Sequence, residues 1–293
     1  MKSDGIILLN KRPGCTSFQE IQFLRKHLQL PKVGHAGTLD KFAEGLLIVL
    51  SGSYTKCSQI FLSLDKTYEA VFRFGEETDT LDPEGETVMQ ARLPAQEEAA
   101  SVLPSFTGKI MQAPPAYSAV HVDGRRAYQA ARKGQSPIMQ KREVTVHALT
   151  LNSWDPPFGK FTVSCSKGTY IRSLARDIGR AAGSCAHVIS LKRTSIGPFS
   201  LEDAVDAQSA STDDVSGGSE RFSRIPVVQT AVLHDRHISQ VLNGRIPDQG
   251  WISELGNEPV VVLFDSNNRL LGLYDYDGSI LKTRYVNSQE ANR

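Results

Sequence analysis

No apolar run in this sequence is longer than residues 46–50, which cover five positions. A membrane-spanning helix needs about 18 such residues, and the N-terminal residues also lack the apolar core of a secretion signal. The four cysteines form no Cys-x-x-Cys pair, which favours scattered buried thiols over a zinc site or a disulfide framework. We therefore expect a cytoplasmic protein with no membrane association and no metal site.

The sequence also lacks the glycine-rich fingerprint of dinucleotide-binding folds and the lysine of a phosphate-binding loop. Its 293 residues suffice for one large domain and a small one. The net charge of +1 hides an asymmetry: residues 1–200 carry 25 Lys and Arg against 18 Asp and Glu, whereas residues 201–293 carry 8 against 14. A phosphate-rich partner should therefore prefer the first part of the chain.

Residues 34–47 are the most informative segment that is present, because three glycines, His35 and Asp40 precede an apolar run. Glycines let the backbone approach a bound partner closely, and a carboxylate fixed between them can act as a nucleophile or a base. The alternative is a tight turn in which Asp40 caps a helix that begins near Ala43. The residues of this segment alone do not decide between these interpretations.

A second informative segment is basic. Residues 121–147 hold six Lys and Arg against two acidic residues, with His121 and Tyr128 interleaved. The six are Arg125, Arg126, Arg132, Lys133, Lys141 and Arg142. A cluster of this kind is typical either of a solvated surface or of a face that binds RNA.

Periodicity predicts mixed secondary structure. Ser17 and Glu20 have the spacing of a capping box before a helix over about residues 17–29. Residues 68–74 and 161–165 have the pattern of strands, and a helix is expected after the second strand, over about residues 171–178. Helices and strands alternate irregularly, which favours an α+β fold with a mixed sheet flanked by helices.

The last third of the chain changes character. Residues 207–224 are rich in Ser, Asp and Gly, which predicts a linker or a long loop. Short strands are expected beyond it, near residues 226–228, 259–264 and 270–274. We therefore expect a first domain over residues 1–225 and a small β-rich domain over residues 226–293.

Residues 34–47 resemble the signature Gly-His-x-Gly-x-Leu-Asp, with a Gly-Leu-Leu-like run after it, of the TruB-type tRNA pseudouridine synthases. Other segments resemble the same family in the same order over roughly residues 5–200. They are residues 5–11 with Thr16 and Ser17, 65–68, 75–82, 115–119, 167–172 and 186–193. Chance is a poor explanation for so many ordered matches.

The resemblance implies the pseudouridine synthase fold, with a largely antiparallel mixed sheet, and an isomerase that needs no cofactor. It would convert the T-loop uridine of tRNA, position 55, to pseudouridine by flipping the base, cleaving the C1′–N1 bond and joining C1′ to C5. Asp40 matches the catalytic aspartate of the family, and Arg172 matches the arginine that keeps this aspartate charged. Tyr68 matches the tyrosine that stacks on the uracil and takes part in the loss of the C5 proton.

Other positions acquire roles only through the resemblance. His35 would occupy the space that the flipped base leaves, Tyr170 and Leu191 would line the pocket, and Lys11 matches a lysine near it. A thumb-like RNA-binding insertion would span about residues 105–147, and the C-terminal domain would be a PUA-like RNA-binding domain. The expected partner is the T-arm of tRNA, bound by a monomer without a guide RNA.

The sequence departs from the family in three places: Lys41 follows Asp40 where proline is common, Glu44 replaces a small or hydroxyl residue, and Arg12 interrupts a usual Lys-Pro pair. None of these changes removes a catalytic group. The alternatives are an aspartyl-phosphate enzyme, which would need a second Asp two positions after Asp40 where Phe42 stands, and an RNA-binding module without catalysis. The same chemistry on another RNA is a third alternative.

Overall fold

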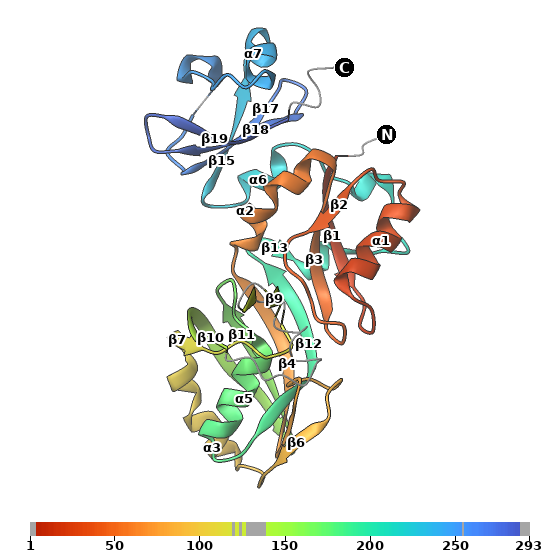
Figure 1. Ribbon diagram of the computed structural model, residues 1–293, viewed down its shortest axis with the longest axis vertical. Helices are drawn as coiled ribbons and strands as arrows, with labels where there is room; N and C mark the ends of the chain where they lie inside the picture. The colour runs from red at the N-terminus through yellow and green to blue at the C-terminus, as the bar shows by residue number, and fades with distance from the viewer. Residues whose placement is uncertain (1–3, 119–120, 123–124, 127–138, 254, 288–293) are drawn as a thin grey trace.

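The computed structural model describes residues 4–118, 121–122, 125–126, 139–253 and 255–287. A ten-stranded sheet forms the first domain and a five-stranded sheet forms the C-terminal one. Figure 1 shows the two sheets one after the other along the long axis of the molecule. The architecture confirms the α+β prediction and the β-rich character of the C-terminal part.

Eight of the ten strands of the large sheet follow one path. The order of its main strands is β14 (Val205–Asp206), β1 (Gly5–Lys11), β3 (Glu44–Ser51), β12 (Ala186–Ile196), β4 (Lys66–Phe74), β11 (Phe158–Cys165), β10 (Arg142–Asp155) and β7 (Gly108–Gln112). Two short strands, β2 (Val33–His35) and β13 (Phe199–Ser200), pair with β3 and β12 at the sides of this path. Only the β1–β14 and β3–β12 pairs are parallel, so the sheet is mixed and largely antiparallel, as predicted.

The remaining elements of the first domain are short. Among the described residues its α-helices are α1 (Ser17–His27), α2 (Ser58–Leu62), α3 (Gln96–Ser101), α5 (Ile171–Ala181) and α6 (Glu220–Ser223). Two hairpins, β5 (Glu76–Thr78) with β6 (Thr87–Gln90) and β8 (His121–Val122) with β9 (Arg125–Arg126), lie outside the large sheet. Among the described residues, no helix is long and apolar enough to cross a membrane.

The sequence pattern explains the two central elements nearest the candidate site. Strand β4 buries Tyr68, Ala70, Phe72 and Phe74 on one face, which confirms the predicted alternation. Helix α5 buries the apolar stripe that begins at Ile171 and lies beside β12, to which it makes most of its contacts. Both elements therefore contribute to one apolar cluster, which also contains Leu39.

The N-terminal helix begins where it was predicted, but its cap was assigned to the wrong residues. Thr16 is the N-cap residue, and its hydroxyl and the side chain of Gln19 form the capping box. The predicted pair has other partners: Ser17 bonds the backbone of Leu39, and Glu20 pairs with Arg12. The capping-box pattern considers only the first turn of a helix, whereas Ser17 and Glu20 bond residues outside the helix.

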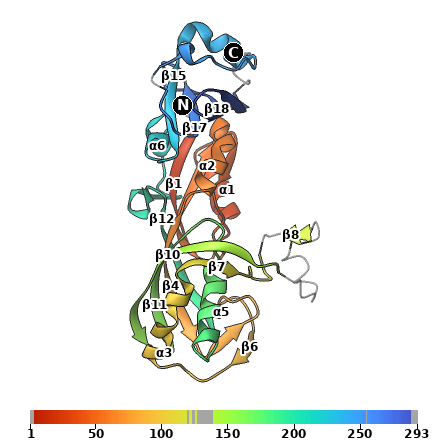
Figure 2. The same cartoon turned by 90° about the vertical axis from the view of Figure 1, so that its left-hand side faces the viewer.

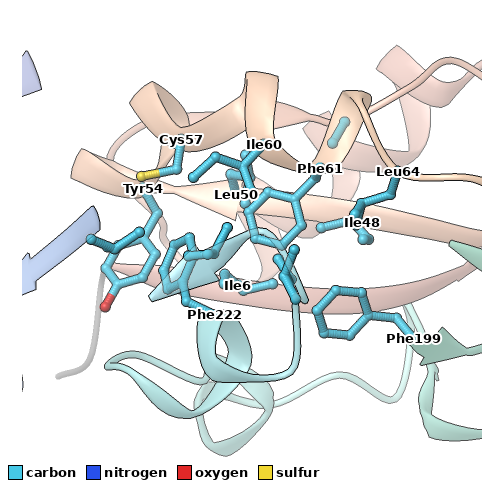
Figure 3. Packing of buried hydrophobic residues seen from close by; sticks show 14 of the residues in the cluster. Ile6, Ile48, Leu50, Tyr54, Cys57, Ile60, Phe61, Leu64, Phe199 and Phe222 are labelled. Carbon is cyan, nitrogen blue, oxygen red and sulfur yellow. The ribbon is translucent and has the colours of Figure 1, made fainter. Parts of the chain in front are cut away.

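Residues 207–224, predicted as a linker or a long loop, contain helix α6 as well as loop and pack within the first domain. Its 3-10 turn, residues 212–214, is followed by Ser216, which exchanges two backbone hydrogen bonds with Ile6. Val215 and Phe222 are fully buried. Figure 3 shows Phe222 packed with side chains of β1, β3 and α2, so this segment is part of the core.

The C-terminal sheet continues this core. Its strand order is β16 (Ile252–Ser253), β15 (Val228–Leu233), β17 (Val260–Phe264), β18 (Leu270–Tyr276) and β19 (Leu281–Val286), with helix α7 (Ile238–Leu242) beside it. Phe264 of β17 contacts Phe222, and both belong to the cluster that contains Ile6. Because one apolar cluster joins the two sheets, we expect the domains to move as one body.

Candidate active site

The segment that carries Asp40 is a loop between two strands of the large sheet. Strand β2 ends at His35 and strand β3 begins at Glu44, with the two strands paired antiparallel. The alternative interpretation, a helix from about Ala43 that Asp40 caps, is therefore wrong: an extended strand follows. Gly45 has a positive φ of 103°, and a Cβ there would overlap the backbone of Arg193, so glycine is needed where the loop returns to the sheet.

Two buried side chains, Ser17 and Lys11, bond the backbone of the loop that carries Asp40. The hydroxyl of Ser17 accepts from the Leu39 amide at 2.9 Å and donates to the Leu39 carbonyl at 3.0 Å. The ammonium of Lys11, which is 0% exposed, donates to the carbonyls of Ala43 at 2.6 Å and Lys41 at 3.4 Å. The residues on both sides of Asp40 are therefore held, and the carboxylate cannot move far.

The Lys41 side chain contributes less to the loop than its backbone does. Its ammonium lies 2.8 Å from the carboxylate of Glu84, but the two side chains are 52% and 42% exposed. Exposed ion pairs stabilise proteins weakly because water screens them. With lysine in place of a rigid proline after Asp40, the loop is held by the hydrogen bonds of the buried residues Lys11 and Ser17.

Asp40 faces Arg172, the second residue of α5. Arg172 Nε lies 3.0 Å from Asp40 Oδ2, and Arg172 Nη2 donates to Oδ1 at 3.2 Å. The Arg172 side chain is 5% exposed and that of Asp40 is 37% exposed, so the arginine is enclosed while the carboxylate keeps a free side. This is the arrangement expected of a reactive carboxylate held in place by its partner.

Asp82 is a third member of this cluster, and sequence reasoning assigned it no role. Its Oδ2 accepts from Arg172 Nη1 at 2.9 Å, and its side chain is 7% exposed. Its Oδ1 accepts from the hydroxyl of Thr80 at 2.6 Å and from the Glu84 amide at 3.0 Å. Asp82 thus fixes the guanidinium from the side opposite Asp40.

Two backbone carbonyls also accept hydrogen bonds from the Arg172 guanidinium. The guanidinium donates to the carbonyl of Thr80 at 2.9 Å and to that of Tyr117 at 3.0 Å. Tyr117 lies in the segment between β7 and β10, so one arginine joins three segments that are distant in the sequence. We infer that its rotamer is set by the fold before any substrate binds.

Burial raises the pKa of Asp40, although part of the side chain is exposed. The Arg172 guanidinium opposes this shift most strongly and Lys11 adds a smaller effect, while the carboxylate of Asp82 acts in the same direction as burial. Without Arg172, Asp40 would therefore be protonated more readily. The arginine keeps the carboxylate available in its ionised form.

The structure also brings the predicted pocket residues near Asp40. Tyr68 and Leu191 are buried in one apolar cluster with Leu39, the neighbour of Asp40. Tyr170 directly precedes α5 and Arg172, and the guanidinium of Arg142 lies 5.0 Å from its ring centroid. These residues lie on strand β4, on strand β12 and directly before α5.

His35 ends strand β2, and its Nδ1 is buried without a hydrogen-bond partner. Burial lowers the pKa of this imidazole, and the charge of Arg193 adds to the effect. His35 is therefore neutral near pH 7, and its free nitrogen can accept or donate one hydrogen bond.

The predicted RNA-binding residues fall into four groups. Lys141 is exposed at the start of β10, next to Arg142, while Lys11 is fully buried and bonded to the Asp40 loop. Arg125 and Arg126 form strand β9, which pairs with β8, and Figure 2 shows β8 far from the large sheet. Arg132 and Lys133 lie outside the described residues.

The burial of Lys11 leads to a prediction. Lys11→Met removes the donor of three carbonyls and should lower the free energy of unfolding by about 3–5 kcal/mol, since two of the bonds are short and a hydrogen bond to a charged group contributes about 1.5–3 kcal/mol. Urea denaturation measures this change. Lys141→Met is the control, because that side chain is exposed, and equal stability of both variants would contradict the anchoring role.

Comparison with known proteins agrees with this geometry. Residues 25–171 match the family described as TruB family pseudouridylate synthase (N terminal domain), and residues 172–213 match the tRNA pseudouridylate synthase B C-terminal domain. A tRNA pseudouridine synthase B of Borreliella burgdorferi is 48% identical over 204 residues, which cover 69% of this chain and 72% of that protein. One of Burkholderia pseudomallei is 41% identical over 287 residues, or 92% of both chains.

Two solved structures share the fold. A chain in a structure of an H/ACA RNP bound to a substrate RNA containing 2′-deoxyuridine has a TM-score of 0.68 at 22% identity, over 96% of this chain and 84% of that one. A chain in a Cbf5-Nop10-Gar1 complex has the same TM-score at 24% identity and the same coverage. These two structures show the fold alone, whereas the family match and the similar sequences also identify the family. The chain therefore belongs to the TruB family of tRNA pseudouridine synthases, isomerases that convert uridine in tRNA to pseudouridine.

Proposed function

We propose that this isomerase acts on the T-loop uridine of tRNA, position 55, and that Asp40 performs the chemistry. The observation that carries the proposal is the Asp40 carboxylate, exposed on one side and held on the other by Arg172, which Asp82 holds in turn. Such a carboxylate can attack C1′ of the ribose or remove the proton from C2′. Both routes break the C1′–N1 bond and need Asp40 in its ionised form.

The aromatic residues near Asp40 fit the remaining steps. A T-loop uridine is stacked, so it must be flipped out before chemistry, at a cost of roughly a few kcal/mol. Tyr68 would stack on the flipped uracil, Tyr170 and Leu191 would line its pocket, and His35 would fill the vacated space. After the uracil turns and C5 joins C1′, the C5 proton must leave, and we assign its removal to Tyr68.

The insertion between β7 and β10 is our candidate for contact with the T-arm. Five basic residues between these strands, and Arg142 at the start of β10, give it the charge that a phosphate backbone attracts. The C-terminal domain would act as a PUA-like RNA-binding module. The proposed enzyme works as a monomer in the cytoplasm. It recognises tRNA through its own surfaces and uses no guide RNA.

Nucleoside analysis of the T-loop tests the proposed position. An unmodified tRNA transcript is incubated with the protein, and the T-loop fragment is isolated, digested and separated by chromatography. We expect pseudouridine at position 55 in this transcript and none when cytidine replaces that uridine. Pseudouridine that appears elsewhere, or in both transcripts, would contradict the proposal.

The raised pKa of Asp40 predicts how the rate of isomerisation falls at acid pH. Because burial raises this pKa above the ordinary value of 3.8 and only the ionised carboxylate reacts, the rate should fall as the pH drops through the raised pKa. Single-turnover rates between pH 4 and pH 8 measure the limb. A rate that stays constant down to the ordinary aspartate pKa would contradict this account.

A further inference from the structure

Arg193 is a large buried side chain to which neither the resemblance nor the proposed chemistry assigns a role. It is 1% exposed and lies on β12, the strand between β3 and β4. In the sheet register it stands opposite Tyr68 of β4 on one side and Gly45 of β3 on the other. Arg193 therefore lies between the candidate base and the end of the Asp40 loop.

The guanidinium donates to two backbone carbonyls beside the site. Its Nε bonds the carbonyl of Leu46 at 2.7 Å, and its Nη2 bonds the carbonyl of Gly37 at 3.0 Å. The two carbonyls fix the arginine in one orientation. Its charge acts on the hydroxyl of Tyr68, the residue opposite it in the sheet register.

In the part of the chain that the structure describes, no carboxylate forms an ion pair with Arg193. The titratable groups around it are the cations Lys11 and Lys66 and the neutral imidazole of His35. A buried charge without a counter-ion typically costs several kcal/mol, and neutral carbonyls compensate only part of this cost. The anion that this position would accommodate is a phenolate at Tyr68.

We propose that Arg193 is a positioning residue that directs the Tyr68 oxygen and stabilises its phenolate while it removes the C5 proton. The inference rests on the proposed function, because it concerns the last step of the same reaction. In that step the C5 proton passes to the Tyr68 oxygen, and the C5–H electron pair becomes the C5=C6 double bond. The electrons of the N1=C6 bond move to N1, which takes up a proton from water.

The surroundings of Tyr68 agree with this role. Burial raises the pKa of the phenol, and the nearby charge of Arg193 opposes this shift. The other titratable groups that face Tyr68 are Cys165 and Asp40, and both disfavour its ionisation. Arg193 is thus the one group among these that favours the phenolate.

Single-turnover kinetics with deuterated RNA test the proposal. Transcripts that carry uridine with hydrogen or deuterium at C5 are compared for wild type, Arg193→Met and Arg193→Lys. Lys192→Met is the matched control, because it removes a positive charge one position away on the same strand. Pseudouridine formation is measured, together with tRNA affinity and the unfolding midpoint of each variant.

We expect Arg193→Met to bind tRNA normally and to react about 10²-fold more slowly, with a rate that depends on deuterium at C5. Arg193→Lys, which keeps the charge, should be slowed less and show the same dependence, and Lys192→Met should react like the wild type. An unchanged rate, or a slower rate that is insensitive to deuterium, would overturn the role of Arg193. If Arg193→Met fails to fold, the deuterium dependence of Arg193→Lys decides, and wild type without any turnover would refute the proposed function instead.

Discussion

Asp40→Asn is expected to bind tRNA almost as well as the wild type and to lose turnover by about 10³- to 10⁴-fold. The amide is nearly the same size as the carboxylate, and its oxygen can still accept from Arg172 Nη2, so the loop keeps its shape. It can neither attack C1′ nor take a proton from C2′. Single-turnover isomerisation and fluorescence anisotropy with labelled tRNA measure the two quantities separately.

Glu84→Gln is the control for this variant. Glu84 lies close enough to influence Asp40, but its carboxylate pairs with Lys41 at the surface. Its removal takes away one nearby negative charge without touching the reacting group. We expect turnover close to that of the wild type; a comparable loss in both variants would mean that general electrostatics, and not the carboxylate at position 40, limits the reaction.

Arg172→Met is expected to lower the free energy of unfolding by about 3–5 kcal/mol, because it leaves the Asp82 carboxylate buried without its counter-ion. It should also reduce turnover strongly, since Asp40 loses the charge that keeps it ionised. Chemical denaturation and single-turnover kinetics measure the two effects. Arg92→Met is the control, because Arg92 pairs with Glu98 just as closely but on the surface, and its loss should change stability little.

A second substitution separates stability from catalysis. Arg172→Met combined with Asp82→Asn removes both members of the buried pair, and breaking one partner alone is the costly case. We expect the double variant to recover part of the lost stability and none of the lost turnover. Full recovery of turnover would show that Arg172 serves folding only.

The local parts of the fold could be predicted from the sequence. Alternation placed Tyr68 on the buried face of a strand, and a 3.6-residue stripe gave α5, because these patterns depend on near neighbours. The capping box was shifted by one residue, since Ser17 and Glu20 have partners far along the chain or outside the helix. Local spacing does not contain such contacts.

The active-site cluster could be predicted only in part. Asp40 and Arg172 were paired through the resemblance, although 132 positions separate them. Asp82 lies inside a segment that also carried the resemblance, but its contact with Arg172 arises only when the β5–β6 turn packs against α5. Leu81, with a positive φ of 62°, marks the strained turn that presents Asp82, and backbone strain of this kind cannot be read from residue types.

Tritium release from tRNA labelled at uridine C5 tests the central claim most directly, in an arrangement of two proteins and two transcripts. Wild type and Asp40→Asn are each incubated with an unmodified transcript and with one that carries cytidine at position 55. The account predicts release only from the wild type with the intact transcript, because the reaction needs both the carboxylate and that uridine. Release by Asp40→Asn at the wild-type rate, or none from wild-type protein that binds the transcript, would contradict it.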